Sequence, residues 1–430
     1  MTKLEKYIFY IFIFLLPLTT RYIFAEWTGI FNEWTAGAIY GTDILLGLLF
    51  LLWLIRLFKT RDRTKLQTSD YVLFGFVLIS GLSIINALIP AIAWFRLLRL
   101  TQFVFLYLYI RHNAQELIFN SKFLIVAIAS GAFQALIGIG QSFKQGALGL
   151  EILGESPLVV GDSGIAVFNA GGELFMRAYG STPHPNVVAL FLMCALWAFY
   201  FWYLNNDYSV SSWKPLILYA MILLGFLLTF SRTIIGIWAL AVLIGLIVFI
   251  TRRHFRHRIV FVLKKLLILI VLTIVILGVF IIIYWPQVNA RIHISRNEEA
   301  VTHRLLFAEM AGNITRQSPV LGVGIGQFVP KLMDQFEDDT AYMYQPVHNI
   351  YLLVLSEVGI LGLAAFVIFL IMLIYRYIKS LNPFDAGGTI LFVLLIGVLV
   401  VGVFDHFLFT IQQGSLMLWI LFGIVGAKNV

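Results

Sequence analysis

The strongest constraint on this chain is a series of long apolar runs, each close to the length that crosses a lipid bilayer as a helix. Such a helix needs about 20 mostly apolar residues. Hydrophobic residues make up 60% of the 430 residues, and charged residues only 12%. A soluble core cannot bury that much apolar surface, so the bilayer must solvate most of the chain. The sequence therefore predicts an all-α fold, a polytopic helical bundle within a membrane.

Twelve runs are candidate transmembrane helices. The first contains Pro17 and lacks a small-residue cleavage site, so we expect a retained span and not a removed signal peptide. The single cysteine, Cys194, excludes an intramolecular disulfide. We expect one integral membrane domain over residues 1–430. The candidate spans are roughly 7–24, 38–57, 71–89, 91–110, 122–143, 185–204, 215–230, 234–250, 264–285, 349–375, 389–404 and 411–427.

The distribution of lysine and arginine predicts the orientation of these spans. With the N-terminus in the cytoplasm, the inner connections collect most of the basic residues, including RLFKTRDRTK at 56–65 and TRRHFRHR at 251–258. The positive-inside rule then favours twelve spans with both termini in the cytoplasm. We interpret the 251–258 cluster as an anchor to anionic lipid head groups. This placement accounts for the net charge of +8, and no nucleic-acid partner is expected.

The longest outer connection is predicted at 286–347, between the ninth and tenth spans. Loops of this length in a compact protein are usually functional. Within it, HRLLFAEMAGNIT at 303–315 has apolar residues at helical spacing and predicts a helix. Three alternating glycines follow, at Gly322, Gly324 and Gly326.

Ionisable side chains in or beside a span are costly there and point to function. Arg96 and Arg99 are spaced i,i+3 on one helix face in the outer half of the fourth span, where they could bind substrate. The alternatives are snorkelling to the interface, or an ion pair with a carboxylate such as Asp43. His184, Asp405 and His406 lie at outer helix ends, where they could line a site or serve structure.

The residues beside the tenth span carry the sharpest expectation. His348 is the last outer residue before that span, and an imidazole has an ordinary pKa of about 6.5, so it can act as a general base. Asn349 could bind substrate or cap the helix. Arg232 lies in a near-absent turn between spans seven and eight, which predicts a fixed anion beside it. Arg304, in the predicted loop helix, is a second candidate, with a solvated surface charge as its alternative.

These residue types fit one reaction class. Arginine binds phosphate through paired hydrogen bonds and stays charged. A lipid diphosphate is an anion that resides at this interface, and a nearby histidine can take the proton of an acceptor hydroxyl. The sequence has no GxxxxGK[ST] and no HExxH motif, so it indicates neither an ATP-driven pump nor a metal site. We expect glycosyl transfer from a polyprenyl-diphosphate donor, without a cofactor.

Three sequence elements resemble the O-antigen ligase and O-antigen polymerase superfamily. They are the pair Ser231–Arg232, the P-x-x-G-x-G-x-G run at Pro319–Gly326 after Arg304, and HNIYLLVLSEVGILG at His348–Gly362. The resemblance covers roughly 180–410. It implies a bacterial cytoplasmic-membrane enzyme with its site facing outside and a donor glycan on undecaprenyl diphosphate. It implies metal-independent catalysis, with His348 as the essential histidine.

The same resemblance assigns essential roles to Arg232 and Arg304. In the ligases of this superfamily the acceptor is the lipid A core, and in the polymerases it is another lipid-linked repeat unit. The motifs occur in both, so they do not separate the two. We expect a ligase-type enzyme, with a polymerase as the alternative.

Two readings from other classes remain. One is a transporter of the same lipid-linked glycan, which would show internal repeats and polar residues at the membrane midplane. The sequence has no such repeat, and its charges gather toward one face. The other is a non-catalytic scaffold, which gives no reason to hold Arg232 in so tight a turn.

Overall fold

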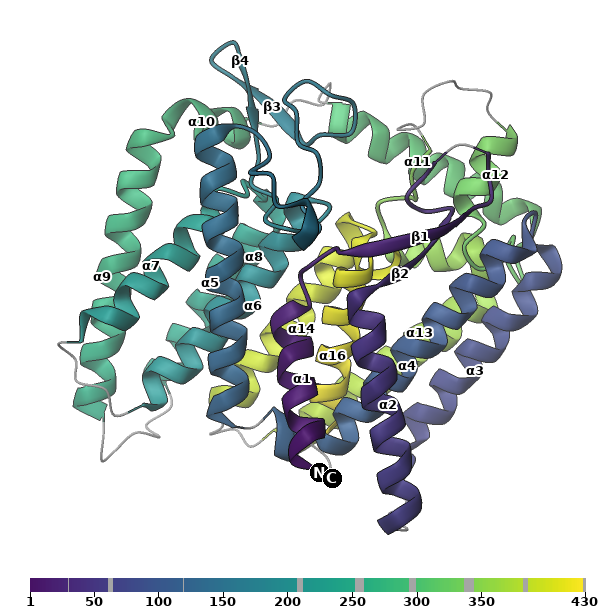
Figure 1. Cartoon of the computed structure of the whole chain (residues 1–430), viewed down its shortest axis with the longest axis horizontal. Helices are drawn as coiled ribbons and strands as arrows, with labels where there is room; N and C mark the ends of the chain where they lie inside the picture. The colour runs from purple at the N-terminus through teal and green to yellow at the C-terminus, as the bar shows by residue number, and fades with distance from the viewer. Residues whose placement is uncertain are drawn as a thin grey trace.

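The computed structural model describes residues 1–29, 31–60, 65–118, 120–206, 212–251, 259–293, 299–335, 344–381 and 386–427. The lipid anchor predicted at 251–258 falls outside these ranges except for Thr251, so it stays a prediction. Within them the chain is overwhelmingly helical (Figure 1).

The apolar helices follow the predicted spans closely. Among the described residues, eight helices are long and apolar enough to cross a membrane, and shorter apolar helices in α7, α8 and α16 accompany them. The predicted class, a polytopic helical membrane bundle, is therefore confirmed. The helices at these positions are α1 (Lys3–Leu15), α2 (Gly41–Thr60), α3 (Thr68–Leu82), α4 (Pro90–Leu117), α5 (Ser121–Lys144), α6 (Pro185–Asn205), α7 (Trp213–Leu227), α8 (Arg232–Thr251), α9 (Ile259–Ile283), α13 (Ile350–Ser380), α14 (Ala386–Phe404) and α16 (Gln412–Ala427).

The first predicted span is wrong in its second half. Helix α1 ends at Leu15, just before Pro17, which has no backbone N–H to continue a helix. The next residues form strand β1 (Arg21–Glu26), which pairs antiparallel with β2 (Ala36–Tyr40). The pairing also delays the second span, because α2 begins only at Gly41.

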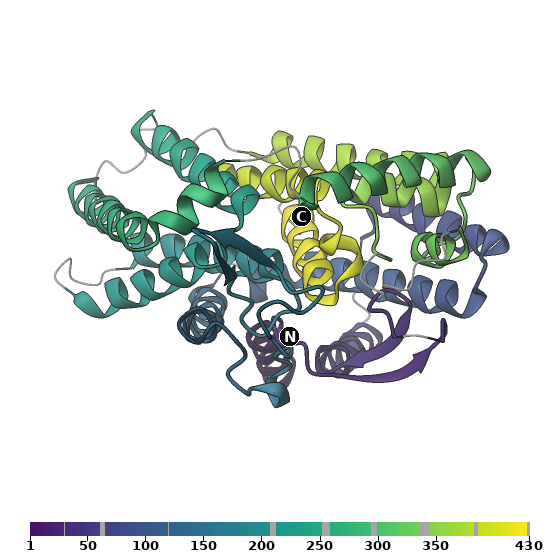
Figure 2. The ribbon, with the colours of Figure 1, turned by 90° about the horizontal axis from the view of Figure 1, so that it is seen from above.

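The remaining elements gather at one end of the bundle (Figure 1). They are η1 (Ser83–Asn86), η2 (Glu151–Leu153), the hairpin of β3 (Val167–Ala170) with β4 (Glu173–Met176), and helices α10 (Trp285–Ile292), α11 (Glu299–Gln317), α12 (Phe328–Gln335) and α15 (Phe407–Thr410). Helix α11 confirms the helix predicted at 303–315. Seen from this end, the β1–β2 hairpin lies along one long edge of the molecule (Figure 2).

The start of α1 and the end of α16 are both at the opposite end of the bundle (Figure 1). The amino group of Met1 is 3.2 Å from a carboxylate oxygen of Glu116, near the end of α4. A Cβ on Gly426 of α16 would stand 3.3 Å from the Arg111 side chain, also near the end of α4. Both helices therefore meet the same end of α4.

Small residues let the helices approach closely, as is usual where lipid provides no hydrophobic drive for helix pairing. A Cβ on Gly131 of α5 would stand only 2.3 Å from the Cβ of Ala195 in α6. A Cβ on Gly225 of α7 would stand 2.7 Å from Ala135 in α5. Helix α5 therefore packs closely against both α6 and α7, and a glycine lies at each contact.

Helix α13 is broken in its first half by Gly359, which has φ 74° and ψ −174°. The residues just before α12 fill the break. The amide of Ile360 donates to the Pro319 carbonyl (2.9 Å), and that of Gly324 donates to the Glu357 carbonyl (2.9 Å). The two glycine-containing motifs of the sequence, Pro319–Gly326 and His348–Gly362, therefore pack on each other and satisfy backbone groups that the break would orphan.

Glu357 completes this joint. Its carboxylate accepts hydrogen bonds from the amides of Gly326 (2.8 Å) and Phe328 (3.2 Å), so it caps the start of α12.

We predict that Gly359→Ala strongly destabilises the fold. This backbone conformation is essentially restricted to glycine and costs any other residue about 1–3 kcal/mol. The new Cβ would also stand 2.2 Å from the Val320 carbonyl oxygen. The measurement is thermal unfolding of the detergent-purified protein. Gly278→Ala is the matched control, because no atom lies within 4 Å of its added Cβ. Equal melting temperatures for the two variants would contradict this account of the joint.

Candidate active site

His348 lies just before α13, at the same end of the bundle as the loop helices. Its ring stacks on Phe307 of α11 (centroids 6.1 Å, 23° between planes) and meets the edge of His406 (4.8 Å, 72°). Its Nδ1 is buried and has no hydrogen-bond partner among the described residues. Burial and the positive charge of Arg304 lower the pKa of His348 despite the opposing charge of Asp405. The ring is therefore neutral at pH 7 and able to accept a proton.

Asp405 and His406 link α14 to α15 beside this ring. Burial opposes ionisation of Asp405, but the positive charge that the neighbouring imidazoles acquire in acid and a hydrogen bond from Asn186 Nδ2 (2.6 Å) hold its pKa below the usual range. Burial lowers the pKa of His406 to about 3. Thr410 donates its hydroxyl proton to the His406 carbonyl (3.1 Å), so Nδ1 of His406 is the donor toward the Thr410 hydroxyl oxygen (2.7 Å). The pair is one carboxylate beside a fixed neutral ring.

His184 caps α6 and faces the same cluster. Its Nδ1 accepts the amide of Asn186 (3.1 Å), so the proton of the neutral ring is on Nε2. Burial lowers its pKa to about 3. Asp405, His348 and Arg304 all act on its charge, which shows that four of the predicted site residues share one electrostatic environment.

Arg177 ties this cluster to the turn between α7 and α8. Its Nε donates to the Thr229 carbonyl (2.7 Å) and its Nη2 to Asn186 Oδ1 (2.7 Å). Ser231 Oγ donates to the same Oδ1 (2.9 Å). The turn is tight enough to hold Phe230 at φ 45°, and α8 then begins at Arg232. The Ser-Arg pair of the sequence is thus a serine that anchors the turn and an arginine that opens the next helix.

The arginines around this turn form a strongly positive region. Arg177 is buried with neutral oxygen acceptors, and burial together with the charges of Arg291 and Arg232 lowers its pKa to about 9. A guanidinium desolvated in this way without a directly bonded carboxylate is costly unless an anion joins it. The region therefore suits a phosphate-type ligand. Arg304, on α11, also faces this cluster, because its positive charge lowers the pKa of both His184 and His348.

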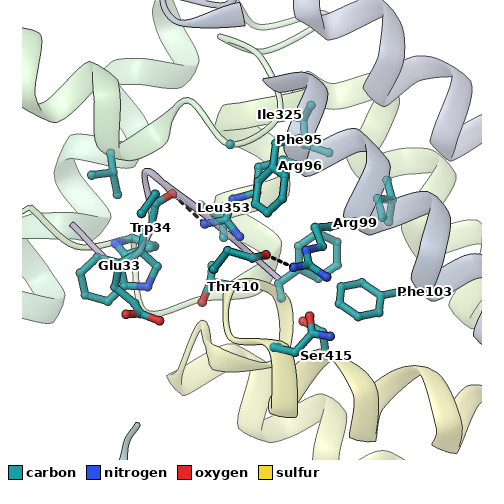
Figure 3. A pocket seen from close by; sticks show the side chains of 18 of the residues that line it. Glu33, Trp34, Phe95, Arg96, Arg99, Phe103, Ile325, Leu353, Thr410 and Ser415 are labelled. Carbon is teal, nitrogen blue, oxygen red and sulfur yellow. Dashed lines mark hydrogen bonds between the residues drawn. The ribbon is translucent and has the colours of Figure 1, made fainter. Parts of the chain in front are cut away.

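Arg96 and Arg99 lie apart from that region, in a pocket beneath the β1–β2 hairpin (Figure 3). Arg99 makes the ion pair with Asp43 that the sequence offered as an alternative (2.6 Å), and it donates to the Ala38 carbonyl. Arg96 donates to the Trp34 carbonyl (2.7 Å). Asn349 caps α13, where its Oδ1 accepts the amides of residues 351 and 352 (2.9 and 3.0 Å).

The structure thus brings His348, His184, Asp405, His406 and Arg304 together. Arg232 follows Ser231 in the chain, and Ser231 is linked to Asp405 through hydrogen bonds of both residues to Asn186. Among the described residues, no group of three His, Cys, Asp or Glu side chains is arranged to hold a metal ion.

Sequence reasoning missed Asn186, Trp34 and Thr410. Asn186 was within reach, because the PHPN motif places a second polar residue just after the candidate His184. Trp34 contacts His406 through the tertiary fold alone, whereas Thr410 follows His406 at helical i,i+4 spacing, a local signal within reach of the sequence.

The fold and the site define an integral membrane protein of many helices with a histidine-arginine cluster at one end. Residues 216–367 match the model of the O-antigen ligase family. That segment contains Arg232, Arg304 and His348, and its match supports the resemblance to the O-antigen ligase superfamily. The match supports a glycosyltransferase activity of the ligase or polymerase type. A search of the curated proteins finds no match.

We predict that Asn186→Ala destabilises the protein by several kcal/mol. The variant leaves Arg177, Ser231 and Asp405 without a shared partner, and a hydrogen bond to a charged group contributes roughly 1.5–3 kcal/mol. The free energy of unfolding can be followed by tryptophan fluorescence during titration with SDS in mixed micelles. Asn313→Ala, on the exposed face of α11, is the control and should stay within about 0.5 kcal/mol of wild type. Similar losses for both variants would dismiss the bridging role of Asn186.

Proposed function

We propose that this protein transfers a glycan from undecaprenyl diphosphate to an acceptor hydroxyl, with the lipid A core as the expected acceptor. The observation that carries the proposal is the neutral His348 ring, with an unpartnered buried Nδ1, beside Arg304 and the Asp405–His406 pair. A neutral imidazole in an apolar pocket is a competent base, and fixed arginines can stabilise a leaving diphosphate.

In the proposed reaction, His348 takes the proton of the acceptor hydroxyl. The hydroxyl oxygen forms a bond to the anomeric carbon of the donor sugar. The bond between that carbon and the diphosphate oxygen breaks, and its electron pair leaves with the polyprenyl diphosphate. Arg177, Arg232 and Arg304 stabilise the negative charge on the departing group. Asn186 and Asp405 position the imidazoles and the turn.

The orientation belongs to the same proposal. We place the protein as a single domain in the bacterial cytoplasmic membrane, with both termini in the cytoplasm and residues 286–347 outside. The site lies at the end of the bundle opposite the start of α1, which supports this placement. Basic residues in the last turns of α2 and α13, Lys59 and Lys379, agree with a cytoplasmic end there.

Removal of the proposed base or of one arginine should abolish transfer. We expect His348→Ala to lower the rate roughly 10²–10⁴-fold and Arg232→Ala about 10²–10³-fold. The assay uses purified protein, an undecaprenyl-diphosphate glycan, no nucleotide and EDTA, with lipid A core and a second lipid-linked repeat offered separately. EDTA should have no effect. Arg316→Ala, on the exposed last turn of α11, is the matched arginine control.

The acceptor that is used separates the alternatives. Transfer to the core alone supports the ligase, and a ladder on the lipid-linked acceptor supports the polymerase. A folded wild-type protein that transfers to neither contradicts the proposal and favours a transporter.

The pH profile offers a second test. Transfer needs His348 unprotonated, and its lowered pKa places the loss of activity below pH 6.5. Asp405→Asn removes a charge that favours the imidazolium, so the acid limb of kcat/KM should move to lower pH. Arg304→Gln removes a charge that disfavours it, so the limb should move to higher pH. Shifts in the same direction, or none, would argue against His348 as the base.

A further inference from the structure

A pocket lies beneath the β1–β2 hairpin. The elements that line it differ from those around Arg177 and Arg232, whose surroundings we call the arginine region. The hairpin, α4, the start of α12, α13 and α16 line it. Aromatic side chains line it, among them Trp34, Phe95 and Phe103 (Figure 3). Tyr40 and Trp419 line it as well. Pockets of this kind, mostly apolar with a few polar groups, are the usual form of small-molecule sites.

Most of the positive charge in this pocket is compensated. Arg21 is paired with Glu33 (2.7 Å), and Arg99 with Asp43 (2.6 Å). Arg96 donates to a carbonyl and is attracted by the Glu357 carboxylate, which also lines the pocket. Among the described residues, Arg177 bonds neutral acceptors and has no bonded carboxylate. A pocket in which two of three arginines already have a bonded carboxylate leaves little positive charge for an added anion, which favours an uncharged ligand.

One polar group in the pocket wall has no partner. The indole N–H of Trp34 is buried without a hydrogen bond among the described residues. A buried donor without an acceptor is costly, and a ligand oxygen that accepted its hydrogen bond would remove that cost. A sugar residue is uncharged, has an apolar face and carries hydroxyl oxygens. It therefore suits both the compensated charges of this pocket and the unpartnered indole N–H of Trp34.

The pocket shares a wall with the histidine cluster. Trp34 meets the edge of the His406 ring (5.7 Å, 84°), and Thr410 bonds His406 while also lining the pocket. Pro346, two residues before His348, lines it as well. A ligand in the pocket would thus lie next to the histidine cluster, along Trp34 and Thr410.

We propose that this pocket is the acceptor subsite and that it binds an uncharged sugar residue of the acceptor glycan. The inference rests on the proposed glycosyl transfer. The donor diphosphate occupies the arginine region, and the acceptor hydroxyl reaches His348 past Trp34 and Thr410.

A pair of tryptophan substitutions on one strand tests this subsite. Ala38 faces the pocket, whereas its neighbour Ile39 is 47% exposed and does not line it. Ala38→Trp should fill the pocket and raise the KM for lipid A core oligosaccharide at least tenfold. Ile39→Trp should leave it unchanged. Affinity for farnesyl diphosphate, measured by calorimetry as a probe of the donor region, should be unchanged in both variants.

The outcomes separate this inference from the function it rests on. If Ala38→Trp transfers with the wild-type KM, or loses farnesyl diphosphate affinity instead, the subsite is overturned and the transferase stands. If wild type transfers to no acceptor, the proposed function fails and the subsite fails with it. A phosphorylated oligosaccharide with a KM tenfold lower than its dephosphorylated form would overturn the preference for an uncharged sugar.

A labelling measurement covers the case in which Ala38→Trp does not fold. In a Cys194→Ala background, Phe31→Cys places a thiol at the pocket rim, where Phe31 is 44% exposed. Dephosphorylated core oligosaccharide should slow maleimide labelling of this thiol at least threefold. Leu174→Cys, on β4 and 49% exposed, is the control and should label at an unchanged rate. Equal labelling of Phe31→Cys with and without oligosaccharide would overturn the subsite.

Discussion

The break in α13 is the constraint on which the outer end of this protein depends. A helix can be interrupted within a membrane bundle only where other protein groups replace its lost hydrogen bonds. Here the segment before α12 supplies them, and it can approach so closely only because Gly359 and Gly322 have no side chain. The same joint holds Glu357 at the start of α12 and Gly326 against Arg96. The wall of the hairpin pocket and the start of α13, where His348 lies, are therefore fixed to one another.

Two electrostatic environments adjoin at this end of the bundle. Around Arg177 a positive charge is desolvated with neutral acceptors, an arrangement that an anion would complete. Around Arg99 and Arg21 each charge already has its carboxylate. Burial lowers the pKa of the His184 and His406 imidazoles between them, so these rings are uncharged at neutral pH. In the proposed reaction, the donor and the acceptor would reach the histidine cluster from these two environments.

Most of the helices could be predicted because a long apolar run in a bilayer has few alternatives to a helix. The exception, the second half of the first span, depends on pairing with Ala36–Tyr40, a contact that local hydropathy does not contain. The grouping of His184, Asp405, His406 and His348 followed from their shared place at outer helix ends. The bond between Asn186 and Asp405 joins residues 219 positions apart, and only the folded chain reveals it.

The β1–β2 hairpin has a consequence for how proteins of this kind diversify. The segment matched by the O-antigen ligase family, residues 216–367, carries His348, Arg232 and Arg304, whereas the hairpin precedes it by far in the chain. A short, partly exposed ribbon can change its side chains without disturbing the helices that hold the reacting groups. On the proposed acceptor subsite, substitutions in these few residues would change which sugar is bound, and a hairpin transplanted between relatives would carry its sugar preference with it.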